Sequence, residues 1–443
     1  MERYNEYKDS GVQWLGEIPS HWEVCKVKHH YKMITGFTPS TGKSEYYSNN
    51  SDNTWVTIAD MKTKFISESS SHISDLYIKN FKPTIVPKGS LLYSFKLSVG
   101  QVAFADKDLY TNEAIASFEN NENVCLGFLF YSASLCIIKN ANTNIYGAFI
   151  LNQELIKNAT IVYPPFAEQK AIANYLDTAT AKIDEAIAQQ QKMIDLLNER
   201  KQIIINNAVT KGLNPDAPMK DSGVDWIGVI PEHWEVSRIK NVITLLTDYD
   251  ANGSFSDIAK NCNINNGTPY AWMVRTTDLV NNRVGIVEGN NYCDKKTYDY
   301  LAKSSLESGD LLMTKRGNVG MVYVVPECSC PMTLAPNLYL LKTKASDINN
   351  RYLMHYLSST KPKSQLAILN KSTTLGALYK DDVKSLQIVL PPIDEQLLLA
   401  QFIDKELDKV DSVISNCNLQ ISLLQERKQI IINDVVTGKV KVS

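Results

Sequence analysis

The feature that most constrains this chain is a long segment that occurs twice. It covers Pro164–Thr210 and returns at Pro391–Thr437, and the offset is constant because 391 − 164 and 437 − 210 both give 227. The run ERKQIIIN is identical in the two copies, at residues 199–206 and 426–433. A repeat of this kind indicates an architecture built from two copies of one unit.

Each copy predicts one long helix that pairs with a partner. No Pro or Gly interrupts it after the opening Pro-Pro, and proline is tolerated only at the start of a helix. Apolar residues recur at steps of three, four or seven, which is the narrow seam of a coiled coil. About 43 residues make a helix of roughly 65 Å. An exposed apolar seam of that length needs a partner, and the simplest partner is the other copy of the helix. The predicted seam comprises Ile172, Leu176, Ile183, Ile187, Ile194, Leu197, Ile204, Leu399, Ile403, Val410, Ile414, Ile421, Leu424 and Ile431.

A second, shorter repeat precedes each globular region. Residues 8–28 (KDSGVQWLGEIPSHWEVCKVK) return at 220–240 (KDSGVDWIGVIPEHWEVSRIK), at an offset of 212. The chain therefore reads as module, domain and helix, twice over. We expect a module and first domain over 1–163, a helix over 164–210, a linker with the second module and domain over 211–390, a second helix over 391–437, and a tail over 438–443.

The two globular regions resemble each other only in fragments. Lys88–Phe104 is similar to Ser308–Val324 at an offset of 220, and Trp55 with Asp60 is similar to Trp272 with Asp278. Short β-branched and aromatic runs alternate with Gly and Asn turns, a pattern typical of strands. We expect a mixed α/β (α+β) fold with a substantial antiparallel sheet in each domain. Similar scaffold positions with different surface residues suggest two copies of one binding domain, each of which recognises a different target.

Composition narrows the class of protein. The net charge is −2, from 46 basic and 48 acidic residues, so the chain is not a generally basic nucleic-acid binder. Residues 233–392 carry 18 basic and 14 acidic residues, however, whereas 393–435 carry 4 and 8, so positive charge gathers on a globular domain. No run reaches the roughly 18 apolar residues of a spanning helix, and the polar N-terminus does not look like a signal peptide. The eight cysteines lack a CxxC pair, which favours free thiols in a reducing cytoplasm.

Three sequence motifs are similar to catalytic or ligand-binding motifs, but each differs from them at a residue that the chemistry requires. Gly36–Ser44 has five residues between its glycines, where a phosphate-binding loop has four. Tyr163 precedes Pro-Pro where amino-methyltransferases need an Asp or Asn, and we interpret both Pro-Pro sites as helix starts. His21 and His233 lie beside tryptophan, where packing explains them better than metal binding. We therefore expect no catalytic residue, no metal site and no cofactor in this chain.

The complete pattern resembles the specificity subunit of type I restriction-modification enzymes (the HsdS family). The resemblance rests on the WLGxIPxHWE modules from Trp14 and Trp226 (WIGVIPEHWE), the PPxxEQ helix starts at 164–169 and 391–396, and the ERKQxII helix ends. It covers almost the whole chain, and the combination repeated in register is highly specific. The globular domains contribute little to it.

The resemblance implies a non-catalytic DNA-binding subunit. Each globular domain would be a target recognition domain that reads one half of a split double-stranded DNA sequence. The two helices would pair antiparallel with a pseudo-twofold relation and fix the gap between half-sites. They would also dock two modification subunits, which use S-adenosylmethionine to methylate adenine. The resemblance further allows restriction subunits that use ATP and Mg²⁺, and it implies no membrane association.

Which residues would contact DNA follows from basic, aromatic and amide side chains in turns. The 220 offset aligns Lys96 with Arg316, both before a glycine, where a basic side chain can reach phosphate or guanine. The predicted DNA contacts are Lys43, Tyr46, Tyr47, Lys62, Lys64 and Lys96 in the first domain, and Asn265, Asn266, Tyr270, Arg275, Lys315, Arg316 and Asn318 in the second.

The repeat also predicts how the modules pack. The second module follows the end of the first helix directly, so the first module should pack against the end of the second helix near Val436. We expect Trp14 and Trp22 to be buried there. Alternatives to the DNA-binding interpretation are a coiled-coil scaffold with two protein-binding heads, an enzyme acting as a methyltransferase or NTPase, and a family member without partner subunits.

Overall fold

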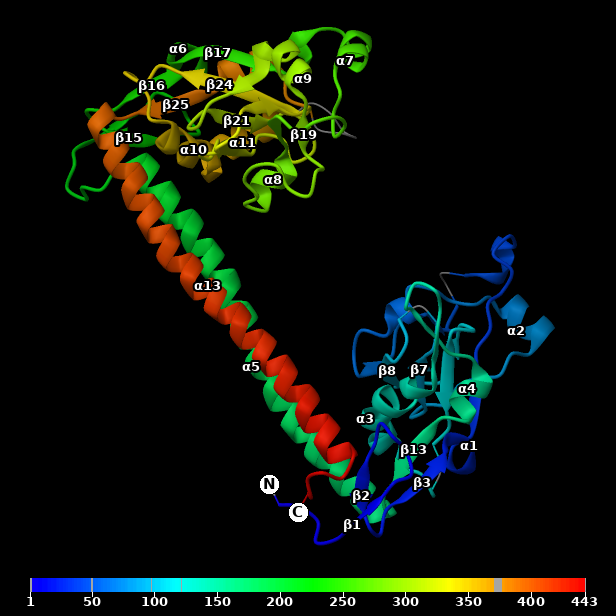
Figure 1. Cartoon of the computed structure of the whole chain (residues 1–443). Helices are drawn as coiled ribbons and strands as arrows, with labels where there is room; N and C mark the ends of the chain where they lie inside the picture. The colour runs from blue at the N-terminus through cyan, green and yellow to red at the C-terminus, as the bar shows by residue number, and fades with distance from the viewer. Residues whose placement is uncertain (1, 49–50, 97, 121, 370–376, 443) are drawn as a thin grey trace. The chain divides into compact units, whose positions relative to one another are not determined.

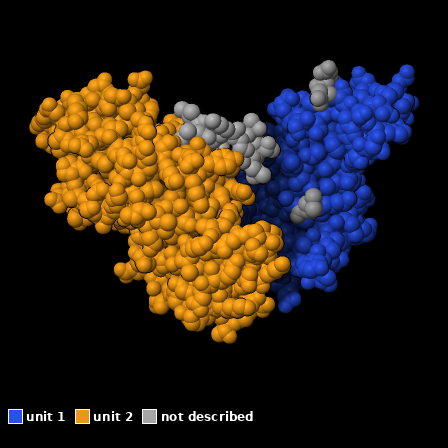
Figure 2. Space-filling view, turned by 90° about the horizontal axis from the view of Figure 1, so that it is seen from above, with its two compact units in different colours: residues 1–190, 419–443 blue, residues 191–418 orange. Residues whose placement is uncertain are grey.

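The computed structural model describes residues 2–48, 51–96, 98–120, 122–369 and 377–442. The chain divides into two compact units, shown in two colours in Figure 2. Unit 1 comprises residues 1–190 and 419–443, and unit 2 comprises residues 191–418. Each unit thus holds one globular domain, the beginning of one long helix and the end of the other. In the described part of the chain, no helix is both long enough and apolar enough to cross a membrane.

The two predicted long helices are present and start directly after the Pro-Pro pairs. α5 is Phe166–Lys211 and α13 is Ile393–Val436 (Figure 1). All fourteen predicted seam residues are buried or half-buried, whereas polar residues between them face solvent. Glu406 occupies the position on α13 that matches Ala179 on α5, and it forms an ion pair with Lys409 at 2.5 Å. The buried apolar stripe is what holds two otherwise polar helices together.

Two ion pairs define the direction of pairing. In unit 1, Lys428 near the end of α13 contacts Asp184 in the first half of α5 at 2.6 Å. In unit 2, Lys201 near the end of α5 contacts Asp411 in the first half of α13 at 2.7 Å. The helices are therefore antiparallel. Adding the repeat offset of 227 to 184 and 201 gives 411 and 428, so each ion pair is the repeat image of the other.

Each globular domain is a mixed α+β fold around a sheet whose strands pair mostly antiparallel, as predicted. In unit 1 the strand order is β4 (Met33–Thr35), β10 (Ile115–Phe118), β7 (Leu91–Ser94), β8 (Val102–Ala105) and β6 (Phe65–Ile66). In unit 2 it is β17 (Ile243–Asp248), β24 (Leu338–Thr343), β21 (Leu311–Thr314) and β22 (Val322–Val324). In unit 1 the edge strand β6 pairs parallel with β8. The first four strands correspond one to one, so the two domains share a topology despite their divergent sequences.

Each domain adds further elements to this sheet. Unit 2 has a second sheet of β19 (Tyr292–Cys293), β18 (Ala271–Val274), β23 (Met332–Leu334) and β20 (Ser305–Leu306). Both units also contain a parallel pair outside this sheet, β5 (Trp55–Val56) with β9 (Tyr110–Thr111) in unit 1 and β18 with β23 in unit 2. One helix packs near the end of each long helix pair, α3 (Leu126–Cys136) in unit 1 and α10 (Asn350–Ser358) in unit 2. Short helices α4 (Gln153–Lys157) and α12 (Lys380–Ser385) precede the strands that lead into the long helices, β13 (Thr160–Tyr163) and β25 (Gln387–Leu390).

The repeated modules seat the helix ends, as the sequence predicts. In unit 1, Trp22 is fully buried and shares a core with Val435 and Val436 at the end of α13. Trp14, which the sequence predicts to be buried there as well, is only half-buried against the same core. A Cβ atom at Gly438 would clash with Pro19 and lie 3.0 Å from the Trp22 ring, so only glycine permits this approach. In unit 2, Trp234 packs in the same way with Ala208 and Val209 at the end of α5.

A carboxylate at each helix start holds the module. Glu168, in the first turn of α5, accepts hydrogen bonds from Trp22 Nε1 at 3.0 Å and Tyr4 OH at 3.1 Å, and contacts His21 Nε2 at 2.6 Å. Its repeat image Glu395 accepts from Trp234 Nε1 at 3.0 Å and contacts His233 Nε2 at 2.8 Å. The Glu of each PPxxEQ motif therefore binds the HW pair of the module in the same unit. This pairing joins two motifs that lie more than 140 residues apart in the sequence.

Replacing Trp22 by Ala should lower the free energy of unfolding by about 3–5 kcal/mol, because it leaves a cavity where a fully buried indole stood. Urea denaturation followed by circular dichroism measures the change. Tyr146→Ala is the matched control, since Tyr146 is 87% exposed in the same unit and its loss should change stability by less than about 0.5 kcal/mol. Equal effects of the two substitutions would contradict the packing of the module on α13.

Glu168 also predicts a dependence of stability on pH. Burial alone would raise the pKa of Glu168, but the hydrogen bonds from Trp22, His21 and Tyr4 outweigh burial and lower it from 4.5. A carboxyl with a lowered folded-state pKa stabilises the fold fully above its unfolded value and loses this contribution as pH falls through the folded value. Glu168→Gln should therefore cost about 1–2 kcal/mol near pH 7 and progressively less below pH 4.5. Urea titrations at several pH values test this, with Glu185→Gln, exposed on the same helix, as the control; a cost independent of pH would count against it.

Candidate nucleic-acid interface

One loop has the same internal scaffold in both domains. It joins β7 to β8 in unit 1 and β21 to β22 in unit 2, and the strand registers match at the offset of 220. Ser94 Oγ donates to the Ser98 carbonyl and accepts from Gln101 N at 3.0 Å. Thr314 Oγ1 donates to the Asn318 carbonyl and accepts from Met321 N at 2.9 Å. A hydroxyl at the same strand end thus fixes the same loop in each domain. We call these segments, residues 95–101 and 315–321, the twin loops.

The twin loops present different side chains from this common scaffold. Lys96 is exposed on the first loop, while Arg316 and Asn318 are exposed on the second. Lysine offers a point charge, whereas the planar guanidinium of arginine can donate two hydrogen bonds to one base edge. Such loops can contact two different sequences with one backbone geometry.

Lys315 takes a supporting position in the second loop. Its counterpart at the 220 offset is Phe95, which is buried. Lys315 Nζ lies 2.8 Å from Asp248 Oδ2 and 2.7 Å from Asp250 Oδ2, and only 17% of its side chain is exposed. Burial would raise the pKa of Asp248, but Lys315 and Lys380 outweigh burial and lower it. The charge of Lys315 is therefore already balanced at the base of the loop, behind Arg316.

The other predicted residues of the second domain mostly stabilise their own loops. Arg275 donates to both oxygens of buried Asp278 and to the Asn290 carbonyl at 2.9 Å. Asn265, at a positive φ of 54°, accepts the backbone N–H of Tyr292 at 3.2 Å. The Asn266 side chain accepts the N–H of Gly267 at 3.0 Å, and Tyr270 packs against Tyr298. These contacts give each of the four a structural role, and DNA contact by them stays a prediction.

In the first domain, Lys43, Tyr46 and Tyr47 lie within an aromatic cluster. Lys43 Nζ is 3.1 Å from Tyr46 OH, and the Tyr46 ring packs edge-on against Tyr77 and Phe81. Tyr47 OH donates to the Pro39 carbonyl at 2.8 Å. Phe81 is 55% exposed, so part of this apolar cluster faces solvent beside a lysine. Aromatic rings next to an exposed lysine suit a nucleic-acid surface.

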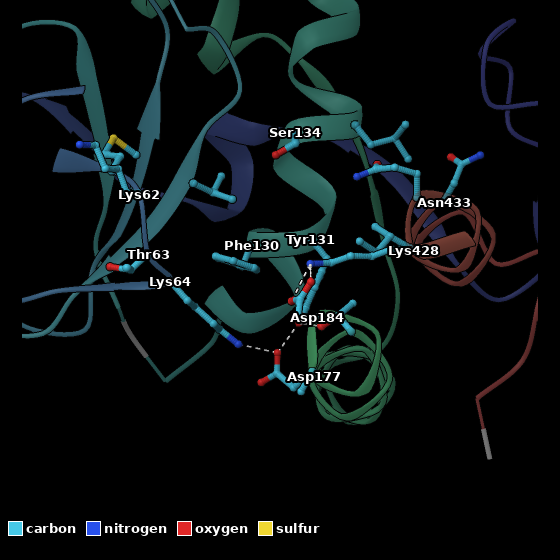
Figure 3. Close-up of a pocket in the computed structure, with 17 residues that line it drawn as sticks. Lys62, Thr63, Lys64, Phe130, Tyr131, Ser134, Asp177, Asp184, Lys428 and Asn433 are labelled. Carbon is cyan, nitrogen blue, oxygen red and sulfur yellow. Dashed lines mark hydrogen bonds and ion pairs between the residues drawn. The ribbon is translucent and has the colours of Figure 1, made fainter. Parts of the chain in front are cut away.

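Lys62 and Lys64 line a cavity of about 650 Å³ in unit 1, where the domain meets α5 and the end of α13 (Figure 3). Lys64 Nζ lies 2.5 Å from Asp177 Oδ1 of α5, and Tyr131 OH of α3 donates to the same oxygen at 2.5 Å (Figure 3). Lys64 therefore fastens the domain to the helix. Lys62 is exposed at the rim.

The repeat image of Asp177 has the same role in unit 2. Asp404 of α13 contacts Arg351 Nε at 2.8 Å and His355 Nε2 at 2.8 Å, both from α10. Burial would raise the pKa of Asp404, but His355 and Arg351 lower it overall. One aspartate on each long helix thus anchors the globular domain of its unit. The sequence held the signal, since both positions are Asp at the 227 offset, but not the identity of the partners.

Comparison with known proteins agrees with this geometry. The family model of the type I restriction modification DNA specificity domain matches residues 19–194 and 231–422. The type I restriction enzyme MjaIX specificity subunit of Methanocaldococcus jannaschii is 24% identical over 99% of this chain and 97% of its own length. The type I restriction enzyme EcoBI specificity subunit of Escherichia coli is 22% identical over 80% of this chain and 75% of its own length.

Two solved structures share the fold. A chain from a structural study of complex assembly and conformational transition of the type I R-M system superposes with a TM-score of 0.68 at 15% identity, covering 96% of this chain and 99% of that chain. The HsdS subunit from Thermoanaerobacter tengcongensis superposes with a TM-score of 0.50 at 16% identity, covering 96% of this chain and 98% of that chain. The two stretches that match the family model together cover most of the sequence. The chain therefore belongs to the type I restriction modification DNA specificity domain family.

Proposed function

We propose that this chain is the subunit that selects the DNA sequence in a type I restriction-modification complex. Each globular domain reads one half of a split duplex target. The twin loops carry this proposal, because one scaffold holds Lys96 in the first domain and Arg316 with Asn318 in the second. Two different half-sites are the expected result of one loop geometry with two sets of side chains. The length of the paired helices sets the spacing between the half-sites.

The partner subunits follow from a repeated exposed surface. Leu196 and Ile203 on α5 are 50% and 57% exposed, and their repeat images Leu423 and Ile430 on α13 are 54% and 51% exposed. Exposed apolar side chains at the same positions of both copies mark a protein contact used twice. One such surface lies in each unit, which suits two modification subunits. S-adenosylmethionine, and ATP with Mg²⁺ where restriction subunits join, belong to those partners, and we place the complex in the cytoplasm.

Sequencing of N6-methyladenine in DNA from cells that express this chain with its modification subunit tests the function. We expect a split motif with a fixed gap that appears only with this chain. Arg316→Ala should relax one half of that motif and weaken binding by about 1–3 kcal/mol, because a bidentate base contact is lost. Lys303→Ala, exposed in the same domain, is the control. Absence of new methylation, with the modification subunit active beside another specificity chain, would favour a scaffold that binds proteins instead.

Subunit docking is tested by placing a charge on the repeated surface. Ile203→Glu and Ile430→Glu should each weaken one modification-subunit site by about 2 kcal/mol or more, since a carboxylate would be buried in an apolar contact. Native mass spectrometry should show a stoichiometry reduced from two to one for each variant, and to zero for the double variant. Val413→Glu on α13, whose repeat image is Ala186, is the matched control. Two bound subunits in the double variant would place the docking surface elsewhere.

A further inference from the structure

A hairpin in the first domain presents apolar side chains to solvent at its tip. β11 (Asn142–Thr143) and β12 (Phe149–Ile150) form the hairpin, and Ile145 and Tyr146 at its tip are 90% and 87% exposed. Phe149 and Ile150 are also about half exposed. Grouped exposed apolar side chains of this kind mark a binding surface.

The tip is held in one shape. The Asn144 side chain accepts the backbone N–H groups of Tyr146 and Ala148, each at 2.9 Å. Asn144 N donates to the Ala148 carbonyl at 3.0 Å, and Gly147 N donates to the Asn144 carbonyl at 2.9 Å. Gly147, with φ of 78°, closes the turn. Ile145 and Tyr146 are therefore displayed on a built turn, which lowers the entropy cost of binding through them.

The segment that leads into the hairpin lies beside the first twin loop. Ser134 Oγ, in α3, donates to the Gly100 carbonyl of that loop at 2.7 Å. A Cβ atom at Gly100 would lie 3.9 Å from Ile138 Cδ1, and Ile138 starts the turn that leads into β11. In unit 2, the segment at the same place in chain order, directly before α12, also contacts its twin loop. Ala377 bridges to Arg316, and Leu378 N donates to the Lys315 carbonyl at 3.1 Å.

The charge of the segment that contains the hairpin is compatible with duplex DNA. From Val124 to Gln153 the sequence contains one charged residue, Lys139, which is exposed, and no acid. Phosphates meet no repulsion on this segment, and Lys96 and Lys62 add positive charge in the same domain. The surfaces proposed for the modification subunits are on the long helices instead.

We propose that Ile145 and Tyr146 form a wedge that packs into the base stack of the half-site read by the first domain. Apolar side chains of this kind partly unstack neighbouring base pairs, and an aromatic ring stacks on an exposed base of any sequence. The wedge eases local opening of the duplex, which a modification subunit needs in order to reach a base. The inference rests on the proposed function and adds a positioning role for a segment outside the twin loops.

The test uses the complex of this chain with its modification subunits and duplexes that carry 2-aminopurine at successive positions of the first half-site. The wild-type complex should raise 2-aminopurine fluorescence at one step, because unstacking relieves quenching. Ile145→Ala/Tyr146→Ala should abolish this rise and weaken binding about tenfold or more, the scale of one lost stacked base. The slope of log affinity against log salt should stay the same, because no phosphate contact is removed.

Two further variants separate the explanations. Tyr146→Phe keeps the ring and should retain both the affinity and the fluorescence rise. Phe255→Ala removes an equally exposed ring, 92% exposed in unit 2, and should change neither. If the double variant binds DNA and unstacks the half-site as the wild type does, the wedge is refuted while the proposed function stands. Loss of modification-subunit assembly with DNA affinity intact would make the hairpin a protein contact and also refute the wedge. Failure of the wild-type complex to select any DNA would refute the proposed function itself.

Discussion

The antiparallel pairing of two copies of one helix is the interaction on which the rest of this structure depends. Because the copies run in opposite directions, each compact unit receives the start of one copy and the end of the other. Every contact that a domain makes with a helix start or a helix end is therefore available in both units. A parallel pairing would have placed both starts together and left the two modules with different neighbours. The two reciprocal ion pairs of Asp184 with Lys428 and Lys201 with Asp411 are the direct expression of this geometry.

The joints between domain and helix share one electrostatic design. A carboxylate on the helix, Glu168 or Asp404 for example, is partly buried and would be costly there if left unpaired. Donors from the module or the domain satisfy it, and the net effect is to lower its pKa. A hydrogen bond has a preferred angle, whereas an apolar contact does not. A hydrogen-bonded carboxylate therefore restricts the orientation of the domain on the helix more than an apolar contact does. These joints therefore orient each domain on its helices, while tryptophan burial supplies much of the stabilising free energy.

The two domains share the scaffold of the twin loop but differ in the side chains that it presents. The hydroxyl of Ser94 or Thr314 holds the twin loop in the same way, yet the exposed residue two positions later is Lys96 in one and Arg316 in the other. The position before it is Phe95 in the first domain and Lys315 in the second, where Asp248 and Asp250 form ion pairs with the lysine. The partly buried lysine of the scaffold is thus paired with carboxylates, whereas Lys96 and Arg316 at the tips are exposed. This difference allows one fold to carry two recognition surfaces.

The sequence by itself determined the repeat, the two helices with their seams, the order of modules and domains, and the burial of Trp22 near Val436. These features depend on periodicity, on proline at helix starts and on a constant offset, all of which are local or internal to the chain. The tertiary structure decided which basic residues face solvent. Basic residues predicted to contact DNA form ion pairs with carboxylates of this chain in three cases, Lys64, Arg275 and Lys315. Partners such as Asp177 for Lys64 are more than a hundred residues away, and no local pattern encodes such a pairing. The sequence also did not predict that Ile145 and Tyr146 are exposed. An apolar pair in a sequence is as compatible with a buried core as with an exposed turn.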